Sequence, residues 1–263
     1  MTAATYTTQL QAGLGMIAET QLLLELWEPG MDAASLNQVA LNSGRFPNLS
    51  ARRLRNLIME CFGPRYLADG KKPAQLLKAL GSILNHREWA QLLFIYTCRA
   101  NLILRDFVGE VFWAAYGSGR DRLSREDAQF FVVQAKQHGK TTTAWSDSTI
   151  RRVSAYVAGC CADFGLLDNT IRGNYKILPF RIESRVAVIL AHELHFAGHS
   201  DMRLIASPDW ALFGMDRADV LHELKRQALA GLLIVQSASD VIQISWRYNR
   251  MEELINVITN VIA

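Results

Sequence analysis

The sequence has 263 residues, 50% of them hydrophobic and 20% charged, with a formal net charge of +3. This hydrophobic fraction excludes a disordered chain, and the length is sufficient for one large domain or two ordinary ones. The longest apolar stretch, residues 92–116, is interrupted by four charged residues, whereas a membrane-spanning helix needs about 20 apolar residues without interruption. The first residues lack the features of a signal peptide, and the four cysteines follow no metal-binding or disulfide spacing. We therefore expect a soluble, cytoplasmic protein that does not bind a membrane.

The charges are unevenly distributed along the chain. Residues 1–43 carry four acidic residues and no Lys or Arg, residues 44–152 carry 18 Lys or Arg against nine acidic residues, and residues 153–263 carry 10 against 12. A section with such an excess of positive charge is typical of proteins that bind nucleic acid or another acidic partner. A solvated basic face that balances an acidic neighbour explains the same counts, so charge alone does not decide between the two.

Apolar residues recur at helical spacing through the first 165 residues. The predicted helices are 22–27, 33–41, 51–61, a stretch that begins at Pro73, 88–117, 128–137 and 146–164. Ser50 and Ser146 stand where N-terminal caps are expected, and Gly63-Pro64 predicts the end of the third helix. Gly165 is a typical residue for the position just after the last helix of this series.

The remaining sequence alternates short strands and helices. Residues 166–167 and 175–180 are predicted strands around a turn. They are followed by predicted helices 183–197, 201–206 and 217–230, strands 232–236 and 241–246, and a closing helix 251–261. Three helices followed by a hairpin is the order of a winged helix. We therefore expect a mainly α fold, a helical bundle with helix-turn-helix or winged-helix-like parts and short β-hairpins, divided into an N-terminal domain (1–180) and a winged-helix-like C-terminal domain (181–263).

Motifs for catalysis are incomplete. The run His192-Glu193-Leu194-His195-Phe196-Ala197-Gly198-His199 misses the zinc-hydrolase pattern by one position, and no third ligand is evident. Gly139-Lys140-Thr141 lacks the earlier glycine of a phosphate-binding loop, and no nucleophile elbow is present. We therefore expect no enzymatic activity, no catalytic residue, no cofactor, no metal and no small-molecule substrate.

The strongest functional signal is a helix start rich in arginine at residues 50–56. A capping hydroxyl precedes three guanidinium groups, and a helix and a turn come before it, which is the order of a helix-turn-helix. Helix starts of this kind approach DNA because their free N–H groups and positive dipole end attract phosphate. The candidate DNA-binding residues here are Ser50, Arg52, Arg53, Arg55 and Asn56.

A second segment, residues 146–152, has the same composition. Its candidate residues, with two lysines that precede it, are Lys136, Lys140, Ser148, Thr149, Arg151 and Arg152. Lys71 and Lys72 are further candidates from a loop, although a lone lysine pair is usually only solvated. For each helix the alternative is a capped surface helix whose arginines contribute solubility. The recurrence of the pattern within the basic section favours contact with nucleic acid by at least one of the two.

The order of segments resembles the BrxA family of bacterial BREX phage-defence systems. The stretches that carry the resemblance are Glu19-Thr20, Leu49-Ser50-Ala51-Arg52-Arg53, 104–111, 123–127, Phe130-Phe131, Trp145-Ser146-Asp147-Ser148-Thr149, 164–167, 210–213, Asp219-Val220 and 244–246. They span nearly the whole chain, but each is short and only moderately specific.

The resemblance implies a mostly helical protein that binds double-stranded DNA without enzymatic activity and works beside the other BREX defence proteins. It supplies no catalytic residues, and the DNA-contact residues named above come from charge and capping alone. The main hypothesis is a DNA-binding accessory protein that grips the duplex mainly through phosphates. The alternative is an interaction module of the same defence complex with incidental nucleic-acid (DNA or RNA) binding, which an exposed apolar patch around Trp210, Phe213 and Trp246 would favour. A third hypothesis, a metal enzyme that uses His192, His195 and His199, is the least favoured.

Overall fold

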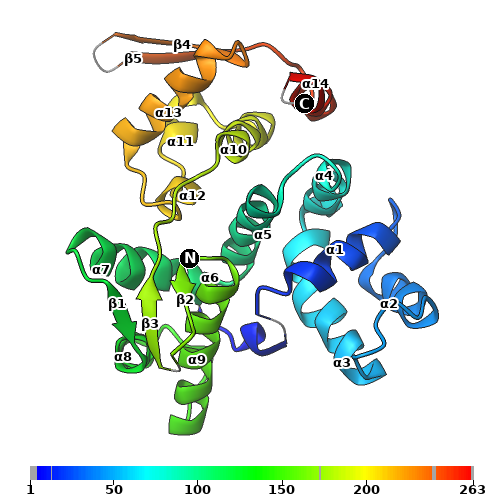
Figure 1. The fold of residues 1–263 in the computed structure, drawn as a ribbon, viewed down its shortest axis with the longest axis vertical. Coiled ribbons are helices and arrows are strands. Elements are labelled where there is room, and N and C mark those ends of the chain that lie inside the picture. Colours follow the sequence, from blue (N-terminus) through cyan, green and yellow to red (C-terminus); the bar gives the residue numbers. More distant parts are fainter. Residues whose placement is uncertain (1–4, 13, 172, 239–240, 262–263) are drawn as a thin grey trace. The chain divides into compact units, whose positions relative to one another are not determined.

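The computed structural model describes residues 5–12, 14–171, 173–238 and 241–261 (Figure 1). The described chain is mainly helical and contains two small antiparallel sheets. Contacts divide it into two compact units. Unit 1 consists of residues 1–78 and 93–180, and unit 2 of residues 79–92 and 181–263. Helix α5 (His86–Ala100) contributes its first residues to unit 2 and the others to unit 1.

The first half of unit 1 is a series of short helices. They are η1 (Gln9–Ala12), α1 (Ile17–Leu26), α2 (Ala33–Asn42), α3 (Ala51–Asn56), the π-helix η2 (Leu57–Leu67), η3 (Asp69–Lys71) and α4 (Lys72–Leu80). Asp32 caps α2, as its carboxylate accepts a hydrogen bond from Ser35 N at 2.8 Å. Most of these elements were expected from apolar spacing, and their bounds shift by a few residues.

The prediction that Gly63-Pro64 ends the third helix is wrong. Residues 51–67 form one helical run, in which α3 continues directly into the π turns of η2. Pro64 cannot donate a backbone hydrogen bond, but the wider turns of a π-helix accommodate it. Phe62 and Tyr66, both at most 1% exposed, lie on either side of Pro64 and hold this part of the helix in the core.

The second half of unit 1 combines helices with a three-stranded sheet. After α5 come α6 (Leu102–Phe107), η4 (Val108–Phe112), α7 (Trp113–Gly117), β1 (Arg122–Ser124), α8 (Arg125–Gln137), α9 (Asp147–Asp163), β2 (Leu167–Asp168) and β3 (Asn174–Ile177). The strand order is β1-β3-β2, with Leu123 opposite Tyr175 and Leu167 opposite Ile177. Strand β1 was not predicted, because three residues are too few to show alternation.

Helices α8 and α9 pack on each other beside this sheet. A capping box fixes the start of α8, where Ser124 and Asp127 exchange side-chain to backbone hydrogen bonds. Aromatic side chains fill the interior, and Phe131 contacts both Phe107 and Tyr6. These contacts hold the N-terminal residues against the second half of unit 1.

Unit 2 consists of helices around a two-stranded hairpin. Its elements are α10 (Ser184–Phe196), α11 (Asp201–Ile205), α12 (Pro208–Ala211), α13 (Arg217–Leu229), β4 (Leu233–Ala238), β5 (Val241–Trp246) and α14 (Met251–Val261). The amide of Gln91 connects residues 79–92 to this unit, since it donates to Arg181 O at 2.7 Å and accepts from Glu183 N at 2.8 Å. The predicted helices and strands are present, with α12 as an addition.

Trp210 and Phe213 belong to the core of unit 2. They are 1% and 4% exposed, and Trp210 Nε1 donates to Leu204 O at 2.8 Å. An exposed apolar patch around Trp210, Phe213 and Trp246 would have favoured the interaction module, but the first two residues are buried and Trp246 is half-buried. Burial of these two large side chains removes apolar area from water and so stabilises the folded state of unit 2.

Among the described helices, none is long and apolar enough to cross a membrane.

Candidate nucleic-acid interface

The start of α3 presents three arginines to solvent. Ser50 Oγ accepts a hydrogen bond from Arg53 N at 3.2 Å, which confirms the predicted cap. Arg52, Arg53 and Arg55 are exposed, and none has a carboxylate partner among the described residues. Leu54 is buried and anchors this turn, so the guanidinium groups are left on the opposite side. They are free to meet an anion.

The start of α9 has the same arrangement on a helix of 17 residues. Ser146 Oγ accepts from Thr149 N at 3.3 Å and lies 2.9 Å from Ser148 Oγ, so hydroxyl groups surround the first turn. Arg151 and Arg152 are exposed and, within the described chain, unpaired with any carboxylate. The free backbone N–H groups, the positive end of the helix dipole and the guanidinium groups of Arg151 and Arg152 therefore all favour an anion at the start of α9.

Three of the four predicted lysines have local partners. Lys71 Nζ donates to Gly30 O at 2.6 Å, and Lys72 Nζ lies 4.0 Å from Asp69 Oδ2. Lys140 Nζ lies 3.5 Å from Glu110 Oε1 and 5.7 Å from the centroid of the Tyr6 ring. Lys136 is half-buried, close in sequence to the start of α9. Exposed ion pairs are weak, so they reduce the availability of Lys72 and Lys140 without removing it.

Unit 1 carries the two arginine clusters on separate helices, and the lysine pair lies apart from the cluster on α3. Helix η1 packs against both η2 and α9, and α3 and α9 extend toward the lower end of unit 1 in the view of Figure 1. Lys71 and Lys72 follow the far end of the helical run 51–67, roughly 20–25 Å from its start. They are therefore separated from the guanidinium groups of α3.

Two further cations stand beside the β2–β3 turn, and the sequence analysis missed them. Arg125 is exposed, and its backbone N donates to Gly173 O at 3.0 Å. Lys176 is exposed on β3, opposite Arg122 of β1 and Asp168 of β2. A search for helix caps could not find them, because their proximity depends on strand pairing.

The histidines of unit 2 form an aromatic cluster. His192 is fully buried and its Nδ1 donates to Val188 O at 2.9 Å, while burial lowers the pKa of His192 to about 4. The His195 ring stacks on Trp246 with centroids 4.3 Å apart. No group of three metal-ligating side chains occurs among the residues that the structure describes. The arrangement is that of core packing.

Comparison with known proteins identifies the family. No curated protein matches the sequence. The fold is similar to the crystal structure of an uncharacterized protein from Magnetospirillum magneticum, with 17% identity, a TM-score of 0.56, and coverage of 73% of this chain and 94% of the other. The model of the BrxA family matches residues 4–193, which include both arginine-rich helix starts. The chain therefore belongs to the BrxA family.

Proposed function

We propose that this protein is a non-enzymatic accessory protein of a BREX phage-defence system that binds double-stranded DNA mainly through phosphate contacts. Membership of the BrxA family indicates a BREX-associated role. The observation that carries the proposal for DNA is the set of exposed guanidinium groups at two helix starts of unit 1, none of which has a carboxylate partner in the described part of the chain. Guanidinium is the side-chain group best suited to phosphate, since its donors match two oxygens at once.

The topology around α9 supports the same site. The order β1-α8-α9-β2-β3, with β3 between β1 and β2 in the sheet, is similar to the order of elements in a winged helix. In that interpretation α9 is the helix that enters the major groove, and the β2–β3 turn is the wing. Gly165, at φ +80°, reverses the chain so that β2 packs back against α9. Arg125 and Lys176 would then provide phosphate contacts beside the wing.

Unit 2 has a similar order of elements but a different charge. Helices α10, α11 and α13 precede the β4–β5 hairpin, and Ile244 N of β5 donates to the Asp201 carboxylate at 2.8 Å, where a winged helix would have a third strand. The start of α13 carries Asp216 and Asp219, which form its capping box. Two carboxylates at a helix start disfavour phosphate, so we assign the DNA contact to unit 1.

The salt dependence of DNA binding tests this proposal. Five to seven phosphate contacts predict that log affinity falls with log salt at a slope of about −4 to −6. Replacement of Arg52, Arg53 and Arg55 by Ala, or of Arg151 and Arg152 by Ala, should weaken binding to unrelated duplexes alike and flatten the slope by about 1 for each lost contact. Fluorescence anisotropy titrations at several salt concentrations measure both quantities.

A variant of unit 2 is the matched control. Arg203→Ala with Arg217→Ala removes the same charge as the Arg151/Arg152 variant, and Arg217 lies at the start of α13, the helix that corresponds to α9. We expect its affinity and slope to equal those of the wild type. If both unit 1 variants bind like the wild type, these helix starts are not the site, and a flattened slope in the control alone would move the site to unit 2.

A further inference from the structure

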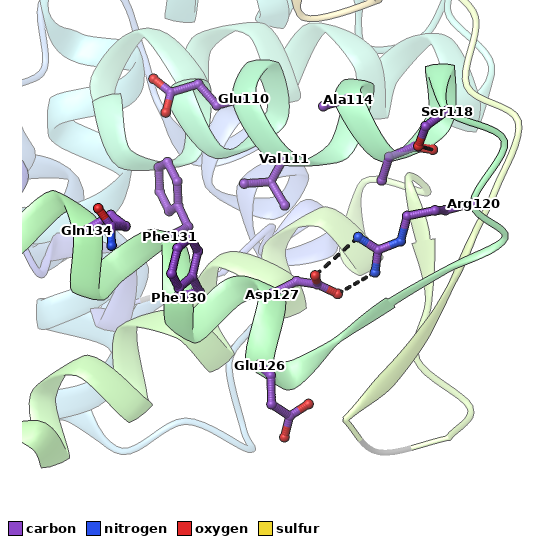
Figure 2. A pocket seen from close by; sticks show the side chains of 11 residues that line it. Glu110, Val111, Ala114, Ser118, Arg120, Glu126, Asp127, Phe130, Phe131 and Gln134 are labelled. Carbon is purple, nitrogen blue, oxygen red and sulfur yellow. Dashed lines mark hydrogen bonds and ion pairs between the residues drawn. The ribbon is translucent and has the colours of Figure 1, made fainter.

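A groove on unit 1 lies between two helical segments, and none of the residues that line it belongs to α9. Its volume is about 650 Å³, and η4 and α7 form one side while α8 forms the other (Figure 2). Val111 and Ala114 provide an apolar floor, and the buried Phe131 extends it. Arg120 closes one end through two hydrogen bonds to Asp127, at 2.7 and 3.2 Å. The groove therefore has the shape and lining of a site for an apolar side chain.

The mouth of this groove combines an exposed aromatic ring with the carboxylate of Glu126, while the other two carboxylates of the lining, Glu110 and Asp127, are paired with Lys140 and Arg120. Phe130 is 65% exposed, which is unusual for a phenylalanine with no covering element. Glu126, four residues earlier on α8, is exposed and has no basic partner among the described residues. Figure 2 shows its carboxylate turned outward at the rim. An occupant should therefore present an apolar group beside a positive charge, and a phosphate is disfavoured.

Unit 2 presents that combination on α13. Leu229 is 90% exposed, the highest exposure of any large apolar side chain in the described chain. Lys225, four residues earlier on the same helix, is exposed and without an acidic partner in the described part of unit 2. Residues four apart share a helix face. The pair Lys225 and Leu229 thus matches the pair Glu126 and Phe130 in spacing and order, with opposite charge.

We propose that the groove of one copy of this chain receives Leu229 of a second copy, with Lys225 opposite Glu126. Leu229 would fill the apolar floor and cover the Phe130 ring, and the two rim charges would orient α13 along α8. The two contacting surfaces differ, one on unit 1 and one on unit 2. Such a head-to-tail contact leaves a free groove at one end and a free Leu229 at the other, so copies can add in series. None of the arginines proposed to bind DNA takes part.

Sedimentation velocity of the full chain without DNA tests the proposal. The wild type should associate as its concentration rises, through dimers to longer species. Leu229→Glu and Phe130→Glu should each weaken association by about tenfold or more, since each removes an apolar anchor and places a charge in the contact. Both side chains are mostly exposed, so the variants should fold normally, which circular dichroism verifies.

A mixture of the two variants gives the decisive result. Leu229→Glu retains an intact groove and Phe130→Glu retains an intact Leu229, so an equimolar mixture should form heterodimers and nothing larger. A wild type that stays monomeric at every concentration overturns the proposal. So does a mixture that remains monomeric while the wild type associates, or association that neither substitution weakens.

The charge pair provides a second, independent readout. Glu126→Lys and Lys225→Glu should each weaken association, while the chain that carries both substitutions should recover it, because the pair is restored with reversed sign. Failure of the double variant to recover would exclude the proposed orientation of α13. Since no DNA is present, a negative result here leaves the proposed DNA binding intact.

Discussion

At the scale of single residues, the buried histidine of unit 2 links stability to pH. Burial lowers the pKa of His192 to about 4, against an ordinary value of 6.5, and the charge of His195 adds to this effect. The unfolded chain therefore binds a proton in a pH range where the folded unit does not. The contribution of neutral His192 is fully present above about pH 6.5 and is lost as the pH falls toward 4.

We predict that acidification from pH 6.5 to 4 costs unit 2 up to about 3 kcal/mol of unfolding free energy through His192. Urea denaturation followed at several pH values measures this loss. The variant His192→Phe keeps an aromatic ring between Phe196 and Trp246 but cannot titrate, so its stability should change less over the same range. If the free energy of unfolding depends on pH equally in the wild type and in His192→Phe, the loss does not arise from His192.

The four cysteines are another case in which burial determines chemistry. Cys61, Cys98, Cys160 and Cys161 are all buried and unbridged, and burial raises the pKa of Cys160 to about 12. The thiolate is the reactive form, so these side chains should be inert in the native protein. We predict that a thiol reagent at pH 8 labels fewer than one cysteine per folded chain and all four in denaturant. Rapid labelling of the native chain would show that the interior opens readily.

At the scale of elements, the turn at Gly165 connects α9 to the sheet of unit 1. Gly165 has φ +80°, and a side chain in this region of φ is strained. We predict that Gly165→Ala lowers the free energy of unfolding by about 1 kcal/mol or more, measured by chemical denaturation. Gly109→Ala is the control, because this glycine lies in η4 with nothing within 4 Å of an added Cβ. The control should be neutral or slightly stabilising, and an equal loss in both would contradict the explanation.

The elements also show where sequence patterns suffice. Capped starts such as Ser50, Ser146 and the Ser124–Asp127 box were predictable, because a cap needs only residues three or four apart. The helix through Pro64 was not, since the packing of Phe62 and Tyr66 in the core outweighs the local preference of proline. The short strand β1 exists only because β3 pairs with it.

At the scale of the whole molecule, the division into units does not follow the chain. Residues 79–92 belong with residues 181–263, and Gln91 hydrogen-bonds to Arg181 and Glu183. A fragment that ends at residue 180 therefore keeps a helical segment whose partners are missing. We predict that fragment 1–180 melts at a lower temperature than the intact chain and is prone to aggregate, as measured by thermal denaturation and light scattering. A fragment whose Tm equals that of the intact chain would show that residues 79–92 are dispensable.

The sequence by itself determined the helical class, the caps, the two arginine-rich helix starts and the family, because each depends on residues close together in the chain. Only the tertiary structure decided which cations remain free. It gave Lys71 and Lys140 local partners, left Arg52 and Arg151 without a carboxylate partner among the described residues, and buried Trp210. It also left the side chains of Phe130 and Leu229 exposed to solvent. Exposure and pairing depend on segments far apart in sequence, and periodicity carries no information about which distant segments meet.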